Sequence, residues 1–157
     1  MKVRAVDPDR DTSPLLPGAQ FADAFCVTVT APALTARQAA ERMMAHQPRW
    51  IAQLLALRDR LVAPFGLVTA ARLANATADK IGFFPVISAT PARLVAGLDD
   101  RHLDFRLVVD VEPCDKGQRV TATTLVLTHN WLGRIYLAVI LPFHRLIART
   151  LIRQVAG

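Results

Sequence analysis

Two histidines and a tyrosine near the C-terminus are the side chains best suited to chemistry. His129, Tyr136 and His144 stand in a mostly apolar stretch of the chain. Imidazole and phenol groups can move a proton or orient the polar end of a ligand, so these three are the candidate catalytic residues, with Asp23 a more remote one. The alternative, which the pattern favours, is a capped helix start followed by arginines whose stems lie along apolar surface.

A second group of polar side chains alternates along one expected strand. His102, Asp104 and Arg106 share one face of it, because successive side chains of a strand point to opposite sides. They suit either a polar site or a solvent-facing surface with local ion pairs. By alternation they point away from the apolar face, so we favour the solvent-facing surface.

Other kinds of reactive site lack their sequence pattern. No two histidines have the spacing of neighbouring helix or strand positions, so the sequence predicts no metal site. The glycines are isolated, which argues against a glycine-rich phosphate loop, and neither Cys26 nor Cys114 has a histidine nearby. We expect no cofactor and no disulfide framework.

The basic charge does not single out nucleic acid as a partner. The 157 residues carry a net charge of +6, with 16 arginines against 3 lysines. The arginines are scattered among acidic residues and form no basic run. We therefore expect no specific nucleic-acid binding.

Neither end of the chain has the pattern of an export signal or a membrane span. Residues 1–20 contain charges and no apolar core, unlike a signal peptide. Near the C-terminus only nine residues, 135–143, separate Arg134 from His144. A bilayer needs about 20 apolar residues, so we expect a cytoplasmic protein without a membrane span.

The longest apolar segment, 129–155, predicts a long C-terminal helix. Asn130 is placed to cap its start, and Gly133 allows it to approach a neighbouring strand closely. Pro142 predicts a kink near its middle. The apolar face expected to meet the sheet consists of Leu132, Ile135, Tyr136, Val139, Phe143, Leu146 and Ile147.

The rest of the chain reads as a tail or strap at 1–20 and one domain at 21–157. Its expected elements are a strand at 21–31, helices at 36–46 and 48–62, and strands at 81–87, 93–98, 102–112 and 118–128. Residues 63–80 are the least readable, with 67–78 expected to be irregular. The second helix is expected to bury Trp50, Leu54, Leu57 and Leu61 and to leave Arg58 on its polar surface.

The last two strands are expected to form a hairpin around Asp115-Lys116-Gly117. Pairing Val111 with Val120 places Glu112 opposite Arg119 as a cross-strand ion pair. This register puts ten side chains on one inner face: Leu103, Phe105, Leu107, Val109, Val111, Val120, Ala122, Thr124, Val126 and Thr128.

Strands and helices are segregated along the chain, which indicates the α+β class. The order is a strand, two short helices, several antiparallel strands and a long C-terminal helix. It matches the helix-grip architecture, in which a curved antiparallel sheet wraps a long C-terminal helix and leaves a cavity between them.

Several short motifs then resemble an uncharacterised bacterial domain family. They are Gly82-Phe83-Phe84-Pro85-Val86, His102-Leu103-Asp104-Phe105-Arg106, His129-Asn130, Gly133-Arg134-Ile135-Tyr136 and Pro142-Phe143-His144-Arg145. The resemblance covers about residues 15–155. Its members also occur appended to NAD(P)-binding, epimerase-like proteins, and the family is similar to the START-like (SRPBCC, polyketide-cyclase-like) helix-grip superfamily. The resemblance implies a fold but no assigned reaction.

We therefore expect the protein to bind a small, largely hydrophobic molecule between the sheet and the C-terminal helix. One alternative is a cyclase- or dehydratase-type enzyme that uses the same cavity. Another is an interaction module, such as a homodimer, because Leu137, Leu141 and Ile152 lie away from the main apolar face. The expected ligand-binding residues are Trp50, Phe84, Phe105, Leu107, Thr124, Val126, Tyr136 and Phe143.

Overall fold

One antiparallel sheet forms the framework of the protein. The computed structural model describes residues 2–30, 33–66, 79–82 and 84–157, and the expected irregular stretch 67–78 lies outside them. Within these ranges seven strands pair in the order β1-β2-β7-β6-β5-β4-β3. Their bounds are β1 (Arg4–Val6), β2 (Phe21–Val29), β3 (Lys80–Ile81), β4 (Phe84–Ala89), β5 (Arg93–Asp99), β6 (Leu103–Cys114) and β7 (Gly117–Thr128).

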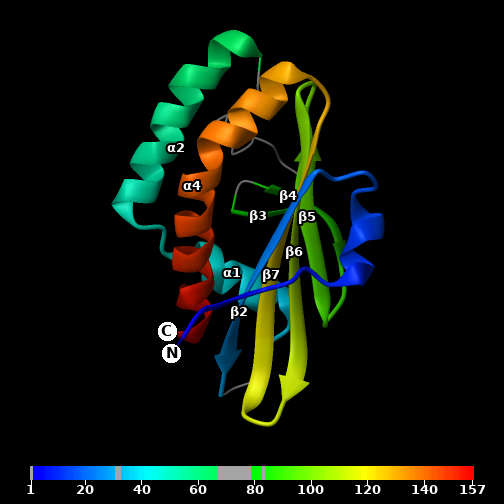
Figure 1. Cartoon of the computed structure of the whole chain (residues 1–157). Coiled ribbons are helices and arrows are strands. Elements are labelled where there is room, and N and C mark those ends of the chain that lie inside the picture. The colour runs from blue at the N-terminus through cyan, green and yellow to red at the C-terminus, as the bar shows by residue number, and fades with distance from the viewer. Residues whose placement is uncertain (1, 31–32, 67–78, 83) are drawn as a thin grey trace.

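Helices lie on both faces of this curved sheet, but the long ones share one face. Figure 1 shows α1, α2 and α4 on one side and the N-terminal segment on the other. The N-terminal segment packs Leu16 against Val95, Val108 and Leu125 on the outer face. The helical elements are η1 (Arg10–Leu15), α1 (Ala36–Ala45), α2 (Arg49–Val62), η2 (Ala63–Phe65), α4 (Trp131–Arg153) and η3 (Gln154–Ala156).

The hairpin of β6 and β7 has the predicted register. Val111 lies opposite Val120 and Glu112 opposite Arg119, and the Arg119 guanidinium donates to the Glu112 carboxylate at 2.7 Å. Gly117 follows the turn with φ of 127°, a conformation that favours glycine. The predicted inner face is confirmed. Nine of its side chains join the main core or line the cavity described below, and the tenth, Thr128, is buried beside Gly133 at the start of α4.

Where the sequence predicted one strand at 81–87, the structure has two. β3 and β4 run antiparallel around Gly82, whose φ of 60° suits glycine. Pro85 lies opposite Lys80 in this short ladder, and the register of β4 against β5 shifts between Val86 and Ser88. The irregularity expected near the proline is therefore present, but the chain also reverses direction just before it.

The helix starts follow the sequence signals. Thr35 and Gln38 form the predicted capping box of α1. The Asn130 side chain accepts from the Gly133 amide at 3.0 Å and caps α4. Helix α4 continues through Pro142, and its ribbon bends along its length in Figure 1.

The start of α4 is joined to the sheet through a buried histidine. Asn130 Nδ2 lies 2.9 Å from His102 Nδ1, and His102 Nε2 lies 2.9 Å from the Phe65 carbonyl oxygen. The amide nitrogen of Asn130 can only donate, so His102 accepts at Nδ1 and donates from Nε2. The solvent-facing position predicted for His102 is wrong, because this histidine connects three segments of the chain.

Helix α4 touches the rest of the fold mainly at its two ends. Its buried residues are Gly133 at the start and Leu151 and Ile152 near the end, followed by Val155 in η3. Between them no described α4 side chain is fully buried. The prediction that Ile135, Val139, Phe143 and Leu146 meet the sheet is therefore wrong, since these side chains are 44–63% exposed.

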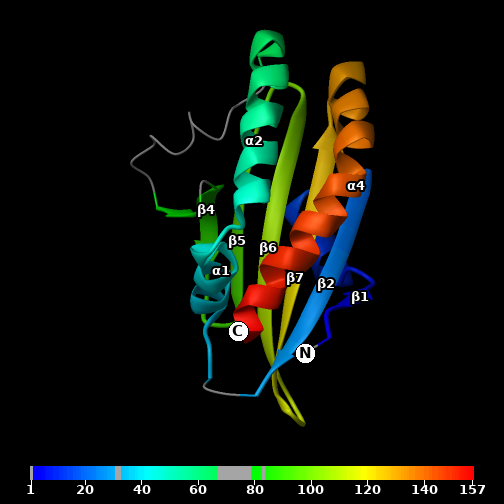
Figure 2. The ribbon, with the colours of Figure 1, turned by 90° about the vertical axis from the view of Figure 1, so that its left-hand side faces the viewer.

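Helix α2 is turned relative to its expected orientation. Its buried residues are Ile51 and Val62, whereas Leu57 and Leu61 are 53% and 62% exposed. The buried stripe expected from Trp50, Leu54, Leu57 and Leu61 is thus displaced by about one residue. Helix α2 stands beside α4 in front of the sheet (Figure 2). Its side chains Ile51, Leu55 and Arg58 line the space under the two helices.

The contact between Gly133 and His102 generates a stability prediction. A Cβ on Gly133 would meet the His102 carbonyl oxygen far inside van der Waals distance. We expect Gly133→Ala to lower the free energy of unfolding by about 1–3 kcal/mol, as overpacked sites do. Urea unfolding measures this change, with Gly157→Ala as the control because that position is open. A Gly133→Ala protein as stable as wild type would contradict the close approach.

Candidate ligand cavity beneath helices α2 and α4

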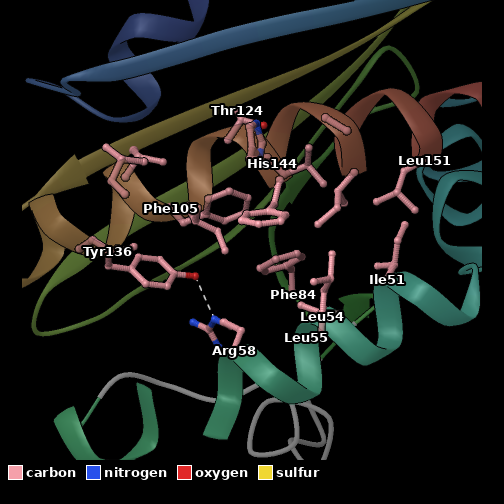
Figure 3. Close-up of a pocket in the computed structure, with 18 of the residues that line it drawn as sticks. Ile51, Leu54, Leu55, Arg58, Phe84, Phe105, Thr124, Tyr136, His144 and Leu151 are labelled. Atoms are coloured by element: carbon pink, nitrogen blue, oxygen red, sulfur yellow. Dashed lines mark hydrogen bonds between the residues drawn. The ribbon is translucent and has the colours of Figure 1, made fainter. Parts of the chain in front are cut away.

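A largely apolar cavity of about 320 Å³ lies between the sheet and helices α2 and α4. This volume is within the range typical of small-molecule sites, about 300–1,000 Å³. Figure 3 shows side chains from α2, α4 and the sheet converging on it. Its sheet wall consists of Phe21, Phe84, Leu98, Leu103, Phe105, Leu107, Ala122, Thr124 and Val126.

The helix walls are apolar as well. The α4 side contributes Tyr136, Leu137, Val139, Ile140, Phe143, His144, Ile147, Ala148 and Leu151, and the α2 side Ile51, Leu54, Leu55, Leu57 and Arg58. Met43, Met44, Gln47 and Asp100 complete the lining. The cavity exists because α4 is held at its ends, so that its middle turns stand away from the sheet.

Aromatic rings form part of the wall. Phe84 of β4 stacks on Phe105 of β6, with ring centroids 4.8 Å apart and planes at 28°. Both residues are only partly buried and pack at the boundary of the main core. Strands β4 and β6 are separated by β5 in the sheet, so this stack spans one strand.

One polar group in the cavity joins α2 to α4. The Arg58 Nε donates to the Tyr136 hydroxyl at 2.9 Å, and Arg58 Nη1 lies 2.8 Å from Asp59 Oδ1 (Figure 3). Burial acts most strongly on Arg58 and lowers its pKa, but Tyr136 and Asp59 outweigh it and raise the pKa above its ordinary value. Arg58 therefore keeps its charge beside an apolar cavity.

The second polar group joins α4 to β2. His144 Nε2 lies 3.1 Å from Asp23 Oδ1, and the two side chains are only 20% and 18% exposed. The His144 ring also meets the Phe21 ring edge-on, with centroids 5.8 Å apart. The other carboxylate oxygen, Asp23 Oδ2, is buried without a hydrogen-bond partner among the described residues.

Two of the three candidate catalytic residues reach the cavity. Tyr136 and His144 line it. His129 does not, because its Nε2 pairs with Asp104 Oδ1 at 2.9 Å away from the lining. Asp23, which the sequence indicated only as a more remote candidate, is the partner of His144.

Most of the expected ligand-binding residues also line the cavity, with one correction. Trp50 is absent from the lining and packs against the main core instead, while its neighbour Ile51 reaches the cavity. Arg58 was missed because it was assigned to a polar surface. The spacing of Ile51, Leu55, Arg58 and Val62 could have placed it on the inner side of α2. The lining residues that were expected are Phe84, Phe105, Leu107, Thr124, Val126, Tyr136 and Phe143.

Three further features bear on the kind of site. In the described ranges no three His, Cys, Asp or Glu side chains gather as a metal site would require. Cys26 and Cys114 are free thiols. By length and composition alone, the segment Trp131–Ala156 is apolar enough to cross a membrane, which is weak evidence for one such helix.

Together these features define an α+β protein with a seven-stranded antiparallel sheet, counted over the described ranges, and an apolar cavity under its C-terminal helix. The sequence matches the family described as "Protein of unknown function (DUF2867)" over residues 15–151. That match spans most of the chain, so the protein belongs to this family.

Other comparisons add little. A comparison with curated proteins found no match. A crystal structure of a Rhodobacter sphaeroides protein is similar at 12% identity and a TM-score of 0.48, covering 99% of this chain and 95% of that chain. A likeness this distant carries no argument about function.

The link between Arg58 and Tyr136 generates a second stability prediction. Tyr136→Phe removes the acceptor of a partly buried charged donor, which costs about 1–3 kcal/mol. We expect Tyr136→Phe, Arg58→Leu and the double variant to show a coupling energy of at least about 0.5 kcal/mol in urea unfolding. Additive effects of the two single changes would show that the hydrogen bond contributes nothing to stability.

Proposed function

We propose that this protein binds a small, largely hydrophobic molecule in the cavity between the sheet and α4, in a domain of the helix-grip (START-like) type. The observation that carries the proposal is the cavity itself: about 320 Å³ of space with an almost wholly apolar lining. A domain this size normally fills its interior, because each buried methylene contributes about 0.8 kcal/mol to stability. Keeping such a space open is expected where another molecule fills it.

The polar groups of the cavity indicate an amphipathic ligand. The Tyr136 hydroxyl accepts from Arg58, so its own proton can be donated to a polar group of a ligand. His144 lies eight residues further along α4, which is about 12 Å along a helix. A ligand that uses both groups would be elongated, with its apolar part against Phe105 and Phe84.

The space between α2 and α4 is the expected entrance. Leu57 of α2 and Val139 and Phe143 of α4 line the cavity and are also exposed, at 53%, 63% and 44%. Figure 2 shows the two helices side by side in front of the sheet. Side chains that are both lining and exposed mark a mouth, and apolar residues there suit the passage of an apolar molecule.

We also propose that α4 remains on the sheet and does not cross a bilayer. Contacts of Asn130 with His102 and of His144 with Asp23 attach it to the sheet side of the fold. Its sequence also carries Arg134, Arg145, Arg149 and Arg153, and a charged side chain at the centre of a bilayer is costly. A cytoplasmic location is the proposal consistent with this arrangement.

Two of the three residues that suggested a homodimer do not belong to an outer face. Leu137 lines the cavity and Ile152 is fully buried. The exposed apolar side chains of α4 are instead Trp131, Ile135, Val139, Phe143 and Leu146. A homodimer stays a prediction, and these five residues are where a second copy would meet the helix.

Filling the cavity tests the proposed function. Ala148 lines the cavity, whereas Ala52 is exposed on α2 and lies outside it. We expect wild type and Ala52→Phe to bind the apolar dye Nile red and Ala148→Phe to lose at least about tenfold in affinity, because the new ring occupies the space. Fluorescence titration measures binding, and melting curves check folding.

A bound ligand should also stabilise the fold. Saturation at 100 times the dissociation constant adds about 2.7 kcal/mol, so the melting temperature of wild type and Ala52→Phe should rise with dye and that of Ala148→Phe should not. A folded wild-type protein that binds no dye, and that no member of a lipid and polyketide panel stabilises, would refute the proposal.

A further inference from the structure

The pairing of His144 with Asp23 has the geometry of a general base directed at an apolar ligand. We propose that His144, oriented by Asp23, removes a proton from a carbon atom of the bound molecule. The substrate class is a largely apolar compound with an acidic C–H next to a carbonyl group. This inference rests on the proposed function, because it requires a ligand in the cavity.

The position of the imidazole supports this role. His144 lines the cavity, and Figure 3 draws its ring among the lining side chains beside Thr124. Asp23 holds Nε2 at 3.1 Å and the Phe21 ring supports one edge. Among the described residues Nδ1 has no hydrogen-bond partner, so this nitrogen is left for a ligand.

The carboxylate supplies what the imidazole needs during proton transfer. When His144 takes up a proton it becomes a cation in apolar surroundings, which is costly without a nearby negative charge. Asp23 provides that charge, and its Oδ2, which has no hydrogen-bond partner among the described residues, leaves the carboxylate free to stabilise the imidazolium. The contact between Nε2 and Oδ1 thus orients the imidazole before any ligand arrives.

The other histidines show that this arrangement is specific to position 144. His102 uses both ring nitrogens in contacts with Asn130 and Phe65, so neither is available. His129 forms the same kind of pair with Asp104, at 2.9 Å, but outside the cavity lining. The chain therefore contains its own control for a histidine–aspartate pair that no ligand can reach from the cavity.

The proposed reaction balances without another reactant. The C–H bond of the ligand breaks, a bond from Nδ1 to hydrogen forms, and the electron pair moves onto the carbonyl oxygen as an enolate. The imidazolium then returns the proton to the same molecule, at the original carbon or at the far end of a conjugated system. The reaction is an isomerisation or an exchange of hydrogen, with no oxidant or reductant.

A chromogenic probe tests the base directly. In nitrobenzisoxazole a base removes the C–H proton of the isoxazole ring, the N–O bond breaks, and a coloured cyano-nitrophenolate forms. We expect wild type to accelerate this reaction at least about tenfold over equimolar free imidazole, since a positioned base contributes about 10²–10⁴-fold. His144→Gln should abolish the acceleration, Asp23→Asn should reduce it severalfold, and His129→Gln should leave it unchanged.

Dye binding separates failure of the base from failure of the cavity. Nile red titration and melting curves are run on all four proteins. A wild type that binds the dye but does not accelerate the probe, or a folded His144→Gln that accelerates it equally, overturns the base and leaves ligand binding standing. A folded wild type that does not bind the dye, is not stabilised by the lipid and polyketide panel and does not accelerate the probe overturns both proposals. Should His144→Gln unfold, Asp23→Asn decides, since an unchanged rate there overturns the pairing.

Discussion

The structure depends on how α4 is held at its two ends. At the start, Gly133 lies against the His102 carbonyl and Asn130 connects the helix cap to the His102 ring. At the other end Leu151 and Ile152 enter the main core. Between these ends the middle turns of α4 stand off most of the sheet, although His144 reaches Asp23 of β2. The cavity is the space that this leaves.

Because the walls of that space are apolar, each polar side chain inside it needs a partner. Charge beside an apolar cavity is tolerated only with a partner, because desolvation of an unpaired ion costs several kcal/mol. Arg58 has Tyr136 and Asp59, and His144 has Asp23. Both links cross between elements, one from α2 to α4 and one from α4 to β2, so they also hold the open arrangement together.

Much of the fold follows from local sequence patterns. Period-two alternation in β6 and β7 identified the inner face, and the short turn at Asp115-Lys116 set the register that pairs Glu112 with Arg119. The capping residues Thr35 and Asn130 marked the starts of α1 and α4 correctly. These features depend on residues close in sequence or on the direct opposition of neighbouring strands, so no distant contact is needed to read them.

The sequence by itself determined the α+β class, the element order and the apolar lining supplied by the hairpin. Tertiary structure alone decided which face of α4 turns inward. Helix α4 is apolar around most of its circumference, so periodicity could not distinguish inward-facing Leu137 from exposed Ile135. The pairing of Asp23 with His144 joins residues 121 positions apart. Such a contact follows from the two fixed ends of the helix and from no local spacing.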